Sequence, residues 1–74
     1  MLTRARGRVE SIEAVRGDAT EITVDISGVK CRAIAYTSLV GEMSTGDDVL
    51  LNTTAVIKRL GSGGYHFVMA NLRE

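Results

Sequence analysis

The chain of 74 residues contains no proline and no tryptophan, one cysteine, one histidine, two tyrosines and one phenylalanine. A single cysteine cannot close an internal disulfide, and one cysteine with one histidine cannot supply the four ligands of a structural zinc site. Acidic and basic residues number nine each, so the formal net charge is zero. Proteins that neutralise many phosphates usually carry a basic excess, so a nucleic-acid partner is not favoured. We expect no metal and no cofactor.

Long hydrophobic runs are also missing. Every apolar stretch is far shorter than the roughly 20 residues that span a bilayer, and no apolar segment follows the basic residues 1–6 as it would in a signal peptide. Together with the lone cysteine, these features predict a cytoplasmic location and no membrane partner. A chain of this length buries only roughly 60% of its unfolded surface, so its stability margin is thin and contact with a partner would matter.

The most regular pattern present is a period-two alternation of apolar and polar residues, which is typical of half-buried β-strands. It runs through residues 20–26 and 29–36, and Ser27-Gly28 joins the two runs. Such a pair predicts an antiparallel hairpin. Its core face should contain Ile22, Val24 and Ile26, beside part of the set Val29, Cys31 and Ala33.

Further strands are expected on both sides of this hairpin. Residues 7–15 form a run whose phase slips between Val9 and Ile12, which indicates a β-bulge. The later strands are expected at residues 48–52, 55–60 and 65–72. A short helical turn is expected at residues 37–40, where Thr37 or Ser38 is a suitable N-cap.

This order of elements predicts an all-β fold: a single domain, residues 1–74, forming a small five- to six-stranded barrel whose closure removes exposed edges. Three strands, a helical turn and then further strands are typical of an OB-like barrel. A barrel-sandwich hybrid is the alternative, because the glycine and aspartate spacing in residues 41–49 is also common in that fold.

A glycine-rich stretch precedes the last expected strand. Gly61-Ser62-Gly63-Gly64 lacks the lysine of a phosphate-binding P-loop, and a strand rather than a helix follows it. We therefore interpret it as a hairpin turn with positive φ at Gly63 or Gly64. His66 follows this stretch by two residues and lies on the opposite face of its strand from Tyr65 and Phe67. We expect it to have a structural hydrogen-bonding role. Cys31 is expected to be a core thiol.

Three arginines alternate at the start of the chain, so that Arg4, Arg6 and Arg8 lie on one face of the first strand. They are the candidate nucleic-acid face, with Tyr36 or Tyr65 available for base stacking. A solvated edge strand protected by charge is the other interpretation.

Residues 33–36, 46–56 and 60–68 resemble the opening segment of an uncharacterised bacterial family, a "domain of unknown function" group. The stretches LNTTAV (51–56) and GSGGYHFV (61–68) carry most of this resemblance, which extends over residues 7–72. It implies that the chain is the N-terminal domain of a longer protein, and it implies no established activity. It also directs attention to the polar groups of these two stretches, which could converge at one end of the barrel. The candidate binding residues are Asn52, Thr53, Thr54, Gly61, Gly63, Gly64, Tyr65 and His66.

The function expected from the sequence is that of a non-catalytic module that docks onto the remainder of a longer chain or onto another copy. No catalytic residue is assigned. One alternative is OB-type nucleic-acid binding through the three arginines, although nucleic acid is not the favoured partner. The other is a composite ligand or active site in a larger enzyme, to which this domain would contribute His66 and Asn52.

Overall fold

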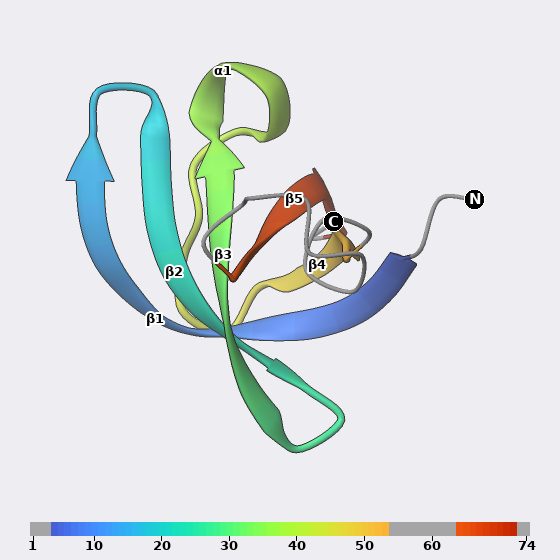
Figure 1. Ribbon diagram of the computed structural model, residues 1–74. Coiled ribbons are helices and arrows are strands. Elements are labelled where there is room, and N and C mark those ends of the chain that lie inside the picture. Colours follow the sequence, from blue (N-terminus) through green and yellow to red (C-terminus); the bar gives the residue numbers. More distant parts are fainter. Residues whose placement is uncertain (1–3, 54–63, 73–74) are drawn as a thin grey trace.

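The computed structural model describes residues 4–53 and 64–72, which form five strands and one helical turn (Figure 1). The elements are β1 (Arg4–Arg16), β2 (Ala19–Ile26), β3 (Val29–Tyr36), α1 (Thr37–Val40), β4 (Asp48–Asn52) and β5 (Tyr65–Asn71). The expected all-β class and the order of these elements are confirmed. The strand expected at residues 55–60 lies outside the described residues. Within the described part of the chain, no helix is long and apolar enough to cross a bilayer.

The five strands close into a barrel in the order β1-β2-β3-β5-β4, with β4 returning to β1. The β3–β5 pair is parallel and the other pairs are antiparallel. A closed five-stranded barrel with a helical turn between its third and fourth strands has the OB-like arrangement expected from the sequence. Closure brings the start of β1 beside the end of β4, although these segments lie far apart in the chain.

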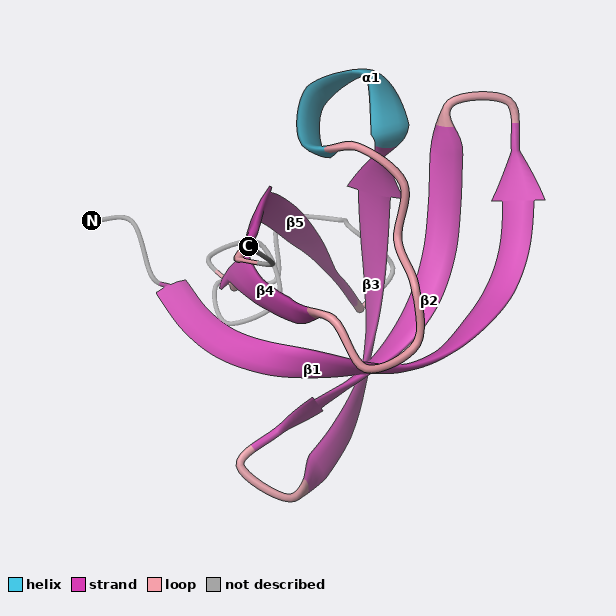
Figure 2. Ribbon diagram, turned by 180° about the vertical axis from the view of Figure 1, so that it is seen from behind, coloured by secondary structure: helices cyan, strands magenta, loops and turns pink. Residues whose placement is uncertain are grey.

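The long strand β1 makes this closure possible because it serves two neighbours. Its first half pairs with β4, from Arg4 opposite Asn52, and its second half pairs with β2. Two register shifts interrupt the β2 pairing, and the first falls at Val9/Ser11, inside the interval where the sequence predicted a bulge. Bulges bend a strand and increase its twist. Figure 2 shows the resulting curve of β1 around the barrel.

The barrel interior is filled by small and branched side chains from all five strands. The buried hydrophobic residues are Val9, Ile22, Val24, Ala33, Ala35, Val49, Leu51 and Val68. The predicted β2–β3 hairpin is confirmed, with Ile22 paired to Ala33 and Val24 to Cys31. The core role considered for Val29 is wrong, because 60% of this residue is exposed where the hairpin tip projects beyond the barrel (Figure 1). Cys31 is only partly buried, packed against the core.

The helical turn α1 is confirmed, but its expected cap is wrong. Neither Thr37 nor Ser38 is the N-cap; Tyr36 holds that position and makes no side-chain capping bond. Asp18, in the turn between β1 and β2, caps the first turn of α1 instead. Its carboxylate accepts hydrogen bonds from Ser38 Oγ (2.5 Å), Thr37 Oγ1 (2.6 Å) and the Ser38 amide (2.8 Å). These bonds lower the pKa of Asp18, the Ser38 hydroxyl having the largest effect. Asp18 therefore ties the β1–β2 turn to α1.

An Asp18→Ala variant should have a lower urea midpoint at neutral pH, because the Ser38 amide and both hydroxyls lose a charged acceptor. Since the pKa of Asp18 is lower in the folded state than its ordinary value of 3.8, this stabilisation is complete above pH 3.8. It is lost as the pH falls through the folded-state pKa. Urea unfolding at neutral and at acidic pH measures both effects. Equal midpoints at neutral pH would contradict the capping role.

Candidate functional site

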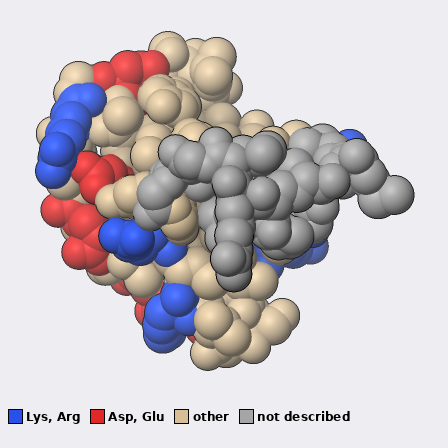
Figure 3. Space-filling model, in the orientation of Figure 1, with Lys and Arg blue, Asp and Glu red and all other residues tan. Residues whose placement is uncertain are grey.

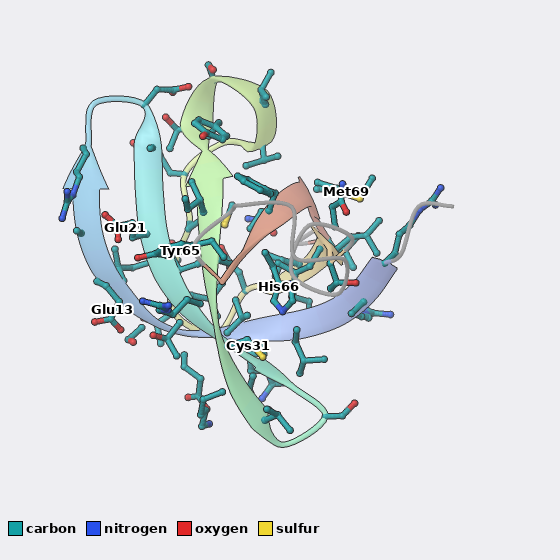
Figure 4. All side chains as sticks on the ribbon, viewed as in Figure 1. Glu13, Glu21, Cys31, Tyr65, His66 and Met69 are labelled. Atoms are coloured by element: carbon teal, nitrogen blue, oxygen red, sulfur yellow. The ribbon has the colours of Figure 1, made fainter. Side chains whose placement is uncertain are left out.

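A pocket of about 380 Å³ lies at the end of the barrel where β1 begins and β4 ends. We call it the His66 pocket. Its lining residues are Arg4, Ala5, Ile26, Val29, Cys31, Thr53 and His66. They come from β1, β2, β3, the residue after β4, and β5. Figure 4 labels His66 on β5 and Cys31 on β3, whose side chains line this pocket from two neighbouring strands. The wall is mostly apolar.

Strand alternation places His66 inside the barrel. Along β5, Tyr65 and Phe67 are partly exposed on the outer face, whereas His66 and Val68 are buried. The expected position of His66 on the face opposite Tyr65 and Phe67 is thus confirmed, and the structure shows that this face points inward, with only 8% of the residue exposed. The parallel pairing of β5 with β3 sets Ala33, a small side chain, opposite His66.

Thr53 reaches the same pocket by continuing the alternation of β4. Val49 and Leu51 point into the core, and Thr53, directly after the strand, follows them with 4% exposure. Among the described residues, neither Thr53 Oγ1 nor His66 Nδ1 has a hydrogen-bond partner. An unsatisfied buried polar group costs about 1–3 kcal/mol, and such groups are rare in folded proteins. The structural hydrogen bond expected from His66 is therefore not made through Nδ1.

Among the described residues, one charged side chain lines the His66 pocket. Burial lowers the pKa of His66 below its ordinary value of 6.5, so the imidazole is neutral at pH 7. Arg4 lies at the pocket with its guanidinium charged. Within residues 4–53 and 64–72, no carboxylate lines the pocket and no salt bridge includes Arg4.

Cys31 and His66 both line the pocket, but among the described residues they are not paired through His66 Nδ1, which has no hydrogen-bond partner there. The Cys31 thiol donates a long hydrogen bond to the Val29 carbonyl (3.7 Å). The described residues also contain no group of three or more histidine, cysteine or acidic side chains placed to hold a metal ion.

The other candidate residues of the same list have different positions. Asn52 pairs in the sheet with Arg4 and Phe67, at the rim of this end of the barrel. Gly64 has φ +86°, so the expected positive φ is confirmed there. Thr54, Gly61 and Gly63 lie outside the described residues, and so does all but the last residue of the hairpin turn expected at residues 61–64.

Tyr65 lies on the outer face of the barrel and not in the His66 pocket. Its hydroxyl donates a hydrogen bond to Glu21 (2.8 Å), and the Arg32 guanidinium lies 4.8 Å from its ring centroid. The hydrogen bond to Glu21 is the main cause that raises the pKa of Tyr65. Arg16 in turn pairs with Glu21 at 2.8 Å. Basic and acidic side chains alternate on this side of the molecule (Figure 3).

The three arginines of β1 are exposed on its outer face, as their alternation predicted. Two of them are accompanied by acidic groups. Arg6 and Arg8 line a shallow hollow together with Asp25 and Asp48, and Arg8 Nε lies 3.9 Å from Asp48 Oδ1. Arg4 is separated from this set because it lines the His66 pocket. The arginines therefore do not form one uninterrupted basic face.

Sequence reasoning identified two residues of the His66 pocket, Thr53 and His66, as binding candidates. It assigned Arg4 to a different site and Cys31 to the core, and it gave no site role to Ala5, Ile26 or Val29. Strand alternation indicates which side chains point inward. The pairing of β1 with β4 and of β3 with β5, which brings these residues together, has no local signature in the sequence.

The model of a family described as "Protein of unknown function (DUF3866)" matches residues 32–74, which is more than half of the chain. The matched segment includes Thr53 and His66, and it begins after Cys31. It confirms the resemblance to a family of unknown function. No curated protein and no solved structure matches the chain.

Proposed function

The chain belongs to the DUF3866 family of proteins of unknown function, and we propose that this domain is a non-catalytic docking module. Its partner would be the remainder of a longer chain or a second copy, which presents a group to the His66 pocket. One observation carries the proposal. Thr53 Oγ1 and His66 Nδ1 are both buried, both unpaired among the described residues, and both belong to residues that line the same pocket.

Two unpaired polar atoms are a considerable burden for a domain of this size, since each costs about 1–3 kcal/mol. A partner group that hydrogen-bonds to both atoms removes this penalty when it binds. The removal of this penalty therefore contributes favourably to the free energy of binding. Both atoms have less than 1 Å² of accessible surface in the isolated domain, so a partner group reaches them by displacing the side chains that cover them. A few polar groups then fix the orientation of the ligand in an otherwise apolar pocket.

The same pocket gives less support to catalysis. General acid–base chemistry commonly pairs two titratable groups, or a nucleophile with a base that activates it. Among the described residues that line the His66 pocket there are one imidazole, one thiol that is not hydrogen-bonded to His66 Nδ1, and no carboxylate. The composite-site alternative would need a further titratable group from the partner, placed beside His66 or Cys31.

The nucleic-acid alternative rests on Arg4, Arg6 and Arg8. Asp25 and Asp48 lie beside Arg6 and Arg8, so nearby carboxylates offset part of the positive charge that would attract phosphates. For that reason the arginine face supports the alternative less strongly than the unpaired polar atoms support docking.

We expect Thr53→Val to raise the free energy of unfolding by about 1–2 kcal/mol, because it replaces an unsatisfied buried hydroxyl with a methyl group of similar size. Urea unfolding measures the change. Thr20→Val is the matched control: Thr20 is also buried, at 5% exposure, but its hydroxyl is not among the unpaired buried atoms. The free energy of unfolding of the Thr20→Val control should not rise. A less stable Thr53→Val variant would show that the Thr53 hydroxyl is already paired in the isolated domain.

Docking itself is tested by amide NMR spectra of the domain, recorded over a wide range of protein concentration and against small anionic, neutral and cationic organic compounds. We expect self-association or at least one class of compound to shift the resonances of Thr53, His66 and Cys31. His66→Leu should remove those shifts while the domain stays folded. Spectra that change under none of these conditions would overturn the proposed function.

A further inference from the structure

The polar groups of the His66 pocket share one property: each can donate a hydrogen bond. The Arg4 guanidinium is a donor only, and the Thr53 hydroxyl can donate because its Oγ1 has no partner among the described residues. A neutral imidazole carries one N–H, and in the tautomer protonated at Nδ1 the unpaired atom of His66 is a donor as well. A group that accepts several hydrogen bonds and carries negative charge complements this set.

The rest of the pocket selects against a small hydrophilic anion. Ala5, Ile26, Val29 and Cys31 supply an apolar wall, and Val29 exposes 60% of its surface. A volume of about 380 Å³ lies at the lower end of the range of ligand pockets, so it suits one short hydrocarbon group rather than an extended cofactor. The ligand should therefore be anionic at one end and apolar along its body.

We infer that the His66 pocket binds a carboxylate attached to a short apolar group, with Thr53 and His66 donating to the carboxylate and Arg4 neutralising it. A carboxylate is an acceptor with about four lone-pair sites, which is enough for all three donors. An ammonium group would be repelled by Arg4 and could accept nothing from Thr53. A neutral amide could accept hydrogen bonds but would gain nothing from the charge of Arg4. The inference rests on the proposed function, since it names the chemistry of the group that docks.

Two sources could present this chemistry: a free aliphatic acid, or the C-terminal carboxylate of a polypeptide that ends in an apolar residue. The recognition would be the same for both. In each case the hydrocarbon lies against Ile26, Val29 and Cys31 and the carboxylate lies toward Arg4.

The experiment is an NMR titration of the domain with hexanoate, hexanamide and hexylammonium, which share one hydrocarbon chain. We expect hexanoate to bind at the His66 pocket at least about tenfold more tightly than the other two compounds, as charge-assisted hydrogen bonds predict. Arg4→Gln should weaken hexanoate binding by about the same factor. Arg6→Gln is the matched control, because Arg6 lies on the same face of β1 but lines a different hollow, and it should leave the affinity unchanged.

The outcomes separate this inference from the proposed function. If hexanamide binds as tightly as hexanoate, or if Arg4→Gln has no effect, the carboxylate inference fails while the pocket remains a docking site. If no compound and no protein concentration shifts the pocket resonances, the proposed function fails as well. A short peptide ending in leucine, with a free or an amidated C-terminus, then identifies the source. Binding of the free form alone assigns the site to a chain terminus, and equal binding of both forms would overturn the carboxylate inference. Binding of neither form, with hexanoate bound, assigns the site to a free acid and would contradict the polypeptide partner of the proposed function.

Discussion

A Leu51→Ala variant should lose about 2–5 kcal/mol of the free energy of unfolding, the usual range for truncating a fully buried leucine. Leu51 has 0% exposure and is among the largest fully buried side chains of the barrel. Its strand, β4, pairs with β1 on one side and with β5 on the other, with Ala5 and Val68 as the direct neighbours of Leu51. Because strands hold both flanks in place, the cavity left by the truncation cannot easily collapse.

The matched control for this variant is Leu50→Ala, the same substitution one residue earlier on the same strand. Leu50 faces the opposite way and is only partly buried. We expect Leu50→Ala to lose less than half as much free energy of unfolding as Leu51→Ala, in urea unfolding measured under identical conditions. Equal losses would contradict the assignment of Leu51 to the interior and would place the register of β4 in error by one residue.

Gly7→Val should destabilise the domain by about 1–3 kcal/mol or more, because Gly7 lies where three segments approach one another closely. A Cβ at this position would lie 3.0 Å from the Asp25 carbonyl oxygen and 3.2 Å from carbon atoms of both Ile26 and Leu51. The first of these is a backbone atom, so β2 would have to move relative to β1 to relieve the close contact. The absence of a side chain at residue 7 therefore allows the first half of β1 to pack against the barrel.

Thermal and urea unfolding of Gly7→Val measure this effect, and Arg6→Val is the control. Arg6 is the preceding residue, on the exposed face of β1, where most substitutions change stability by no more than about 0.5 kcal/mol. A Gly7→Val variant as stable as the control would show that β1 and β2 are less closely packed at this point than the structure indicates.

Several elements could be predicted from sequence because their cause is local. Alternation and the Ser27-Gly28 turn define the β2–β3 hairpin, and β4 begins and ends at the residues expected, Asp48 and Asn52. The bulge in β1 follows from the phase slip after Val9. In each case a period-two pattern or a turn residue determines the conformation of a few neighbouring residues.

The errors have non-local causes. Thr37 and Ser38 were the nearest suitable caps for α1, yet the carboxylate that satisfies its first turn belongs to Asp18, in the turn between β1 and β2. Val29 shares the alternation of a buried strand but lies at the hairpin tip, beyond the end of the barrel. Alternation assigns a face to each residue, but it does not state how far along a strand the core extends.

The His66 pocket could be predicted only in part for the same reason. Thr53 and His66 were candidates, but their common pocket depends on the closure that sets Arg4 opposite Asn52 and Ala33 opposite His66. Those pairings join segments separated by more than thirty residues of chain, as the register shows. The sequence therefore places Arg4 in one set with Arg6 and Arg8, whereas in the folded barrel Arg4 lines a different pocket from the other two.

His66 is a buried, neutral imidazole whose Nδ1 has no hydrogen-bond partner among the described residues, and its protonation behaviour follows from this state. Because burial lowers the pKa in the folded domain, the unfolded chain binds a proton at a higher pH than the folded domain does. The contribution to stability is therefore complete above pH 6.5 and is lost as the pH falls through the folded-state pKa. His66→Leu should remove this dependence, since the chain has no other histidine.

The most direct measurement is an NMR titration of the His66 ring nitrogens and carbon-bound protons with pH, in the isolated domain and with saturating hexanoate. We predict a pKa below 6.5 in the isolated domain and a higher pKa with hexanoate bound, because a carboxylate beside the ring favours its protonated form. A pKa at or above 6.5 in the isolated domain, unchanged by hexanoate, would contradict the account of the His66 pocket.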